Sequence, residues 1–224
     1  GIATMLQQAA QNGDLVAPYF FPLMIAIGGQ YFTTHNLAGA LLLNENNAPI
    51  MVADPRWSLP IGIVNFDAPL AQRLFAELFV QETLDPIIDA GFRGIYLDVL
   101  TVEHSIPYGV QGRPSGDPAA YTRGSLALLN AVRDRLRTRT NNQFYMISEV
   151  TSENYISSLD MMYHDVSLAA ALSFDNAFIV PLWESIYHPY IISTSFQGFI
   201  HPLYFASAYI SPGTIPFIPN RFVP

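Results

Sequence analysis

Two carboxylates interrupt apolar stretches that have the character of buried strands. Asp98 lies near the carboxyl end of Arg93–Leu100 (RGIYLDVL), and Glu149 lies near the end of Phe144–Val150 (FYMISEV). A charge inside an apolar strand costs free energy unless it is paired or faces a wet cavity. One such residue is as readily explained by a helix cap or an arginine partner, but two on consecutive strands favour a catalytic nucleophile and a general acid/base.

The elements that must position these carboxylates indicate an α/β fold with a parallel sheet. From residue 61 onward a strand, a loop and a helix recur, with strands expected at Ile61–Phe66, Arg93–Leu100 and Phe144–Val150. This alternation predicts crossover helices over parallel strands, and it does not separate a closed (β/α)-barrel from an open doubly wound sheet. Active sites of both folds lie at the carboxyl ends of the strands.

Strand spacing then suggests a mechanism. Adjacent strands lie about 4.8 Å apart, so carboxylates at equal heights on neighbouring strands can approach to about 5–5.5 Å. That separation is typical of retaining glycosidases, and a separation of about 6.5–9.5 Å suits inversion. The sequence leaves this choice open.

The sequence patterns of the remaining elements are less regular. The pattern predicts a helix over Ile2–Gln11, a strand over Leu15–Phe21 that Pro18 places at a sheet edge or a bulge, and a long loop over residues 28–60 with a short strand at Ile50–Val52. Asp67 can cap a helix whose first turn contains Pro69, and Pro86 should kink or interrupt that helix. Asp117 can cap the next helix, which ends in arginines that complement the helix dipole and has an apolar stripe of Leu126, Leu129, Val132 and Leu136. Further strands are expected at Leu159–Tyr163 and Phe178–Trp183, and the Pro-rich tail over residues 212–224 should be irregular.

Several side chains near the expected strand ends could contact a substrate. They are carboxylates, a histidine and two aromatics: Glu103, His104, Asp160, Trp183, Glu184 and Tyr187. Aromatic faces stack on the C–H surfaces of sugars, although aromatics make up 13% of this chain and most should be core residues. A solvated loop and a helix N-terminus are the simpler explanations for the polar members.

Composition narrows the function classes. The net charge of −8 opposes nucleic-acid binding, and the absence of cysteine excludes disulfides and thiolate metal sites. The five histidines form no metal-ligand spacing, and no nucleotide-binding glycine motif is present, so no metal or cofactor is expected. No apolar run is long enough for a membrane span, and no signal peptide is visible, so the compartment stays open.

Four segments carry a resemblance to a family of glycoside-hydrolase-like (β/α)-barrels. They are GFRGIYLDVL, DPAAYTRGSLALLNAVRDRLR, ISEVTSENYISSLDMMYH and PLWESIYHPYI, within residues 60–210. The chain is similar, more distantly, to retaining α-glycosidases such as endo-α-N-acetylgalactosaminidases. The resemblance implies that Asp98 is the nucleophile and Glu149 the acid/base. This chain departs from the family in the loop after Asp98: the family's loop is often richer in Cys and His, whereas here His104 is the only histidine and there is no cysteine.

We therefore expect one TIM-like (β/α)-barrel domain over residues 1–224. Because 224 residues is near the lower limit for such a barrel, the start of the barrel should be missing or the chain should be part of a larger one. The expected function is hydrolysis of an oligosaccharide, polysaccharide or glycoconjugate, which would suit an extracellular or periplasmic place. The charged fraction of only 12% also favours one alternative, a non-catalytic self-assembling protein on a barrel-derived scaffold. A further alternative is a sugar-binding module that kept the cleft and lost the acid/base geometry.

Overall fold

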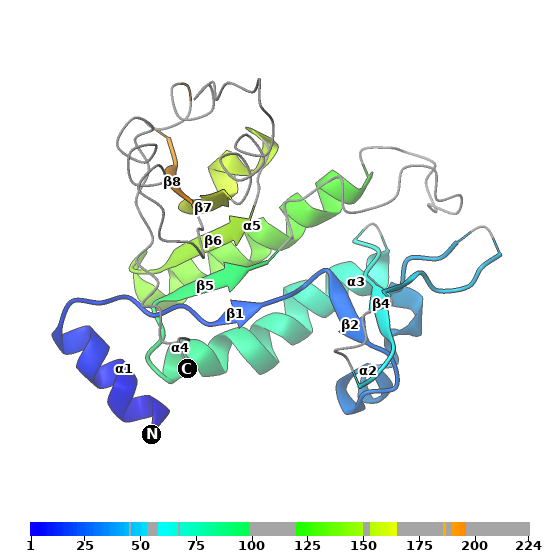
Figure 1. The fold of residues 1–224 in the computed structure, drawn as a ribbon, viewed down its shortest axis with the longest axis horizontal. Coiled ribbons are helices and arrows are strands. Elements are labelled where there is room, and N and C mark those ends of the chain that lie inside the picture. Colours follow the sequence, from blue (N-terminus) through cyan, green and yellow to red (C-terminus); the bar gives the residue numbers. More distant parts are fainter. Residues whose placement is uncertain are drawn as a thin grey trace, which may run out of the picture.

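The fold is α/β and is built around a parallel sheet. The computed structural model describes residues 1–44, 46–52, 58–66, 68–98, 120–149, 153–164, 186 and 190–195. In it a five-stranded sheet has the order β1-β5-β6-β7-β8, and every neighbouring pair is parallel (Figure 1). The strands are β1 (Tyr19–Phe20), β5 (Gly94–Leu97), β6 (Tyr145–Glu149), β7 (Met161–His164) and β8 (Ile192–Ser195).

The predicted alternation is confirmed for the second half of this sheet. Helix α5 (Ala120–Thr140) connects β5 to β6, and the 3-10 helix η4 (Glu153–Ser158) connects β6 to β7. The apolar stripe predicted for α5 is buried, since Leu129, Val132 and Leu136 are at most 2% exposed. The described strands form an open row from β1 to β8, so the parallel α/β class is established, whereas closure into a barrel stays a prediction.

A second helical layer precedes β5. It consists of α3 (Pro69–Arg73), the π-helix η2 (Leu74–Leu84) and α4 (Asp85–Asp89), which follow one another without a break. Pro86 was expected to kink or interrupt this helix, but the helix continues past it, and the hydrogen-bond register changes to π before it. Gly91 ends the segment with a φ of 101°, a conformation that glycine adopts without steric cost.

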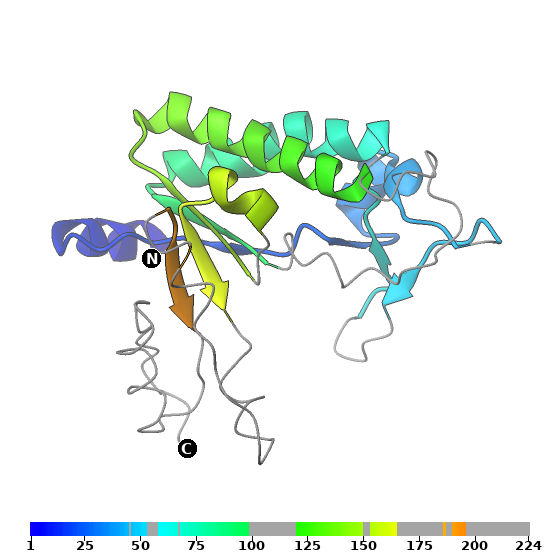
Figure 2. The ribbon, with the colours of Figure 1, turned by 90° about the horizontal axis from the view of Figure 1, so that it is seen from above.

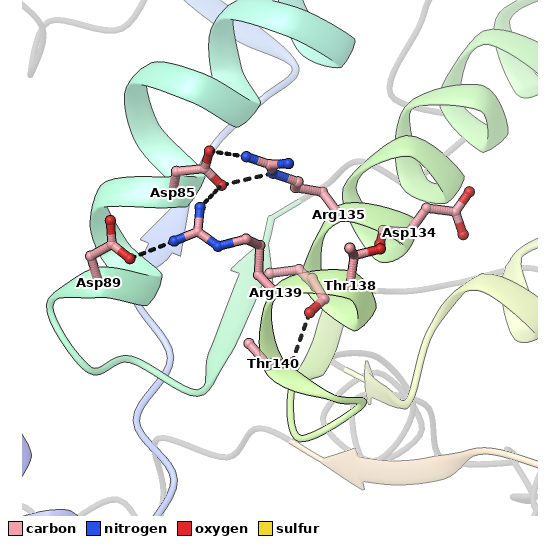
Figure 3. Close-up of polar contacts among 8 residues, drawn as sticks. Asp85, Asp89, Asp134, Arg135, Thr138, Arg139 and Thr140 are labelled. Atoms are coloured by element: carbon pink, nitrogen blue, oxygen red, sulfur yellow. Dashed lines mark hydrogen bonds and ion pairs between the residues drawn. The ribbon is translucent and has the colours of Figure 1, made fainter.

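Helix α5 and the α3–η2–α4 helix lie on one face of the sheet. Figure 2 shows α5 and the α3–η2–α4 helix side by side above the strands, and α5 contacts η2. Two arginines of α5, Arg135 and Arg139, form ion pairs with aspartates of α4 (Figure 3). Strand β6 shows the matching alternation, because Met146 and Ser148 are buried while Tyr145, Ile147 and Glu149 are half-buried. The sheet thus has a packed face toward the helices and a second face that carries Ile147 and Glu149.

The strand predicted at Ile61–Phe66 belongs to a different sheet. Strand β4 (Ile61–Ile63) pairs antiparallel with β2 (Met24–Ala26) and β3 (Met51–Val52), in the order β2-β4-β3. The prediction that it opens a series of parallel strands was therefore wrong. An apolar run shows that a strand is buried, but it carries no information about which strand it pairs with.

The segment predicted as a long loop contains short elements. They are α2 (Gln30–Thr34), the 3-10 helix η1 (Leu37–Ala40) and β3, which confirms the strand expected near Ile50–Val52. Helix α1 (Ile2–Gln11) matches its predicted range, and Leu6 is its one buried residue. The caps expected at Asp67 and Asp117, the strand at Phe178–Trp183 and the tail lie outside the described residues.

Candidate active site

Asp98 occupies the position directly after β5, at the carboxyl edge of the parallel sheet. It is only 8% exposed. Its backbone N–H donates a hydrogen bond of 2.8 Å to the carbonyl oxygen of Phe20, and Tyr19 donates its hydroxyl hydrogen to Oδ2 of the carboxylate. The short strand β1 therefore holds Asp98 through both its backbone and its side chain. The burial cost of the carboxylate is offset by this hydrogen bond.

Glu149 is the last residue of the neighbouring strand. Leu97 pairs with Ser148 in the parallel register, so the next step along both strands brings Asp98 opposite Glu149. Side chains two residues apart point to the same face of a strand, which places Glu149 on the half-buried face with Ile147. Neighbouring strands lie about 4.8 Å apart, and the two carboxylate residues therefore sit side by side at one edge of the sheet.

A buried hydrogen bond fixes the two strands just before the carboxylates. The hydroxyl of Ser148 donates to the carbonyl oxygen of Leu97 over 2.7 Å, and Ser148 has no exposed surface. This contact is additional to the backbone pairing of β5 with β6. It limits sliding of one strand along the other, which would change the relative height of Asp98 and Glu149.

Tyr19 interacts electrostatically with both carboxylates. Its pKa is raised well above the ordinary tyrosine value, first by partial burial, then by the hydrogen bond to Asp98 and by the charges of Asp98 and Glu149. The phenol therefore stays protonated, and remains a donor, to a higher pH than an ordinary tyrosine. Sequence reasoning placed Tyr19 in a strand but missed this role, because nothing in the sequence links positions 79 residues apart.

Asp160 was expected to be a third carboxylate at the same mouth, and this expectation was wrong. Asp160 precedes β7, so it lies at the amino edge of the sheet, opposite to the edge that holds Asp98 and Glu149. Its carboxylate is 3.3 Å from the guanidinium of Arg133 and accepts the backbone N–H of Met146 over 2.9 Å. The simpler explanation of a strand-end carboxylate, pairing with an arginine, holds here.

The other predicted substrate contacts lie outside the described residues. They are Glu103, His104, Trp183, Glu184 and Tyr187. They stay predictions.

The described residues contain no cluster of three or more His, Asp or Glu side chains that could hold a metal ion. None of the helices described is both long and apolar enough to cross a bilayer.

A separate hollow of about 560 Å³ lies at the amino edge of the sheet, away from Asp98 and Glu149. Helix α1 forms one wall with Leu6, and the chain around Asp14, Arg93 and Gln143 forms the other. The carboxyl edge of a parallel sheet is the usual location of catalysis. The paired carboxylates, and not this hollow, therefore define the candidate active site.

Comparison with known proteins gives structural matches only. No protein-family profile matches the sequence, and no curated protein matches it. The α-N-acetylgalactosaminidase NagBb from Bifidobacterium bifidum, as a quadruple mutant, matches 97% of this chain with a TM-score of 0.66 at 14% identity. Its GalNAc complex matches 95% with a TM-score of 0.63 at 14% identity.

A second enzyme gives a similar result. The cycloisomaltooligosaccharide glucanotransferase from Paenibacillus sp., complexed with cycloisomaltoheptaose, matches 87% of this chain with a TM-score of 0.58 at 11% identity. The chain spans 33% and 32% of the two NagBb structures and 28% of the glucanotransferase. At such low identity these matches establish a shared fold.

Proposed function

We propose that this chain carries the catalytic carboxylates of a retaining glycoside hydrolase that acts on an oligosaccharide, polysaccharide or glycoconjugate. The observation that carries the proposal is the register of β5 and β6, which brings Asp98 opposite Glu149 at the carboxyl edge of the sheet. The fold shared with glycoside hydrolases supports the proposal.

The two carboxylates differ in a way that suits two roles. Asp98 is buried and accepts a hydrogen bond from the Tyr19 hydroxyl, so its carboxylate is held in one place at the edge of the sheet, as a nucleophile must be. Glu149 is half-buried, so it can exchange protons with solvent as an acid/base must. We therefore assign attack to Asp98 and proton transfer to Glu149.

The proposed reaction has two steps. In the first, an oxygen of Asp98 bonds to the anomeric carbon, the glycosidic C–O bond breaks, and protonated Glu149 gives its proton to the leaving oxygen. In the second, Glu149 takes a proton from water, the water oxygen bonds to the anomeric carbon, and the bond to Asp98 breaks. The anomeric configuration is inverted twice and so retained.

Hydrolysis of p-nitrophenyl α-N-acetylgalactosaminide and of a panel of other p-nitrophenyl α-glycosides is the first test. The first substrate follows from the GalNAc complex among the structural matches. We expect Asp98→Asn to abolish turnover, and Glu149→Gln to lower it by roughly 10²–10⁴-fold, the usual contribution of a general acid/base. Asp134→Asn, an exposed carboxylate on α5, is the matched control and should leave turnover unchanged.

Azide rescue distinguishes the two roles. Azide should restore turnover of Glu149→Ala with a glycosyl azide of retained configuration, and of Asp98→Ala with one of inverted configuration. Full turnover by a folded Asp98→Asn variant would refute the assignment. Binding of GalNAc without hydrolysis of any glycoside would instead identify a sugar-binding module.

A further inference from the structure

Strand β1 has only two residues, yet both contact Asp98. The carbonyl oxygen of Phe20 accepts the backbone N–H of Asp98 over 2.8 Å, and the hydroxyl of Tyr19 donates to Oδ2 of the same residue. A backbone contact and a side-chain contact together restrict both the position and the rotation of the carboxylate. The contact between Tyr19 and Asp98 therefore has a geometric effect beyond satisfying a buried charge.

We propose that Tyr19 is a positioning residue for Asp98: its hydroxyl holds Oδ2, so that Oδ1 is the oxygen presented to the anomeric carbon. This inference rests on the proposed function and extends it to a residue on another strand. Tyr19 stays outside the bond-making steps, and it acts by setting which carboxylate oxygen attacks.

The surroundings of Tyr19 fit this role. Its ring lies against the ring of Tyr96 with the centroids 5.4 Å apart and the planes inclined by 33°. Tyr19 and Tyr96 are also register partners of the parallel sheet, so the backbone and the rings are held together. A ring fixed in this way delivers its hydroxyl to one place, although 60% of the residue surface is exposed.

The protonation state of the phenol fits as well. Burial, the hydrogen bond to Asp98 and the charges of Asp98 and Glu149 all raise the pKa of Tyr19, so it remains a donor across the neutral range. Hydrogen bonds to an ionised acceptor are about twice as strong as neutral ones. The same donor assists the second step, in which negative charge returns to the Asp98 carboxylate as its bond to the sugar breaks.

The contact itself can be measured without any substrate. In protein labelled with ¹³C at the tyrosine ring carbon that bears the hydroxyl, the Tyr19 signal is assigned by its loss in Tyr19→Phe. We expect this signal to resist ionisation at pH 11, where ordinary phenols of pKa about 10 are mostly ionised. Asp98→Asn should move its titration to lower pH.

Tyr145 is the matched control for this titration. Its pKa is raised by burial alone, and its hydroxyl donates to the carbonyl oxygen of Leu15 over 2.9 Å, at the opposite edge of the sheet. Its signal should not respond to Asp98→Asn. A Tyr19 signal that is equally unresponsive would overturn the inference.

Kinetics then test the role. With p-nitrophenyl α-N-acetylgalactosaminide, or the best substrate of the panel, Tyr19→Phe should lower kcat by roughly 10–100-fold, the effect of losing a hydrogen bond to a charged group. KM should change by less than about threefold, because the hydroxyl is engaged with Asp98 and not with substrate. Tyr145→Phe should retain wild-type kcat.

The outcomes separate this inference from the proposed function. An active wild type whose Tyr19→Phe variant keeps its kcat, or changes only in KM, overturns the positioning role and leaves the hydrolase proposal standing. A wild type that cleaves no glycoside overturns both, and the tyrosine titration then still reports whether the contact exists. A lower kcat together with a titration that responds to Asp98→Asn supports the role.

Discussion

Individual residues of one type play different parts at the two edges of the sheet. Asp98 and Asp160 both adjoin a strand, and the sequence suggests similar roles for them. The structure gives Asp98 a phenol donor at the carboxyl edge and gives Asp160 a guanidinium partner at the amino edge. The residue type and its nearness to a strand are therefore insufficient, and the end of the strand and the chemical partner decide the role.

Substitution of Gly124 in α5 tests how closely this helix approaches the backbone of Phe66. A Cβ at Gly124 would lie 2.6 Å from the carbonyl carbon of Phe66, which is backbone and cannot swing away. Alanine favours a helix over glycine by about 1 kcal/mol, but we expect Gly124→Ala to lower stability because the clash outweighs this gain. Urea unfolding measures the change.

The reverse substitution on the same helix is the control. Ala127 is exposed, so Ala127→Gly should cost about 1 kcal/mol from helix propensity alone. If Gly124→Ala is as stable as the wild type or more stable, α5 does not approach Phe66 as closely as described.

At the scale of elements, ion pairs join α4 to α5. Sequence reasoning assigned the arginines at the end of α5 to the helix dipole. Figure 3 shows a more specific role: Arg135 forms a two-pronged pair with Asp85, and Arg139 contacts both Asp85 and Asp89 of α4. The Arg139 contacts measure 3.1 Å and 2.6 Å. Helices α4 and α5, which are separated by residues 90–119 in the sequence, are thereby fixed side by side.

The stability that the Asp85 ion pairs contribute should depend on pH. The hydrogen bond from Arg135, together with the charges of Arg135 and Arg139, lowers the pKa of Asp85 below its ordinary value of 3.8. A lowered folded-state pKa stabilises the protein above the unfolded-state value, and this contribution is lost as the pH falls through the folded-state pKa. Asp85→Asn should therefore melt at a lower temperature than the wild type at pH 7.

The pH profile decides whether that loss is electrostatic. The difference in Tm between wild type and Asp85→Asn should shrink as the pH falls from 3.8 through the lowered folded-state pKa of Asp85, because the wild-type carboxylate becomes protonated over that range. Asp134→Asn, on the exposed face of α5, should match the wild type both at pH 7 and in acid. A difference that persists unchanged in acid would assign the effect to packing.

At the scale of the whole molecule, local patterns predicted more than long-range pairing. Helix α5, the strands around Asp98 and Glu149 and the parallel class followed from apolar periodicity, because burial sets those patterns within one element. The antiparallel sheet of β2, β3 and β4 and the contact of Tyr19 with Asp98 did not follow, because each joins segments far apart in the chain. The pairing of Asp98 with Glu149 was inferred from the order of the strands, and the register of β5 with β6 supports it.

The distribution of stability over the molecule gives a final prediction. Helix α1 buries only Leu6, has no side-chain cap, and leaves Ile2 and Met5 at least half exposed. Isolated helices shorter than about 12–15 residues are marginal in water, so α1 should open far more readily than α5, whose apolar stripe lies in the core. We expect amide hydrogen exchange to be fast throughout Ile2–Gln11 and slow in the middle of α5. Equal protection of the two helices would show that α1 is stabilised by contacts beyond those described, since its own packing is too small to provide that protection.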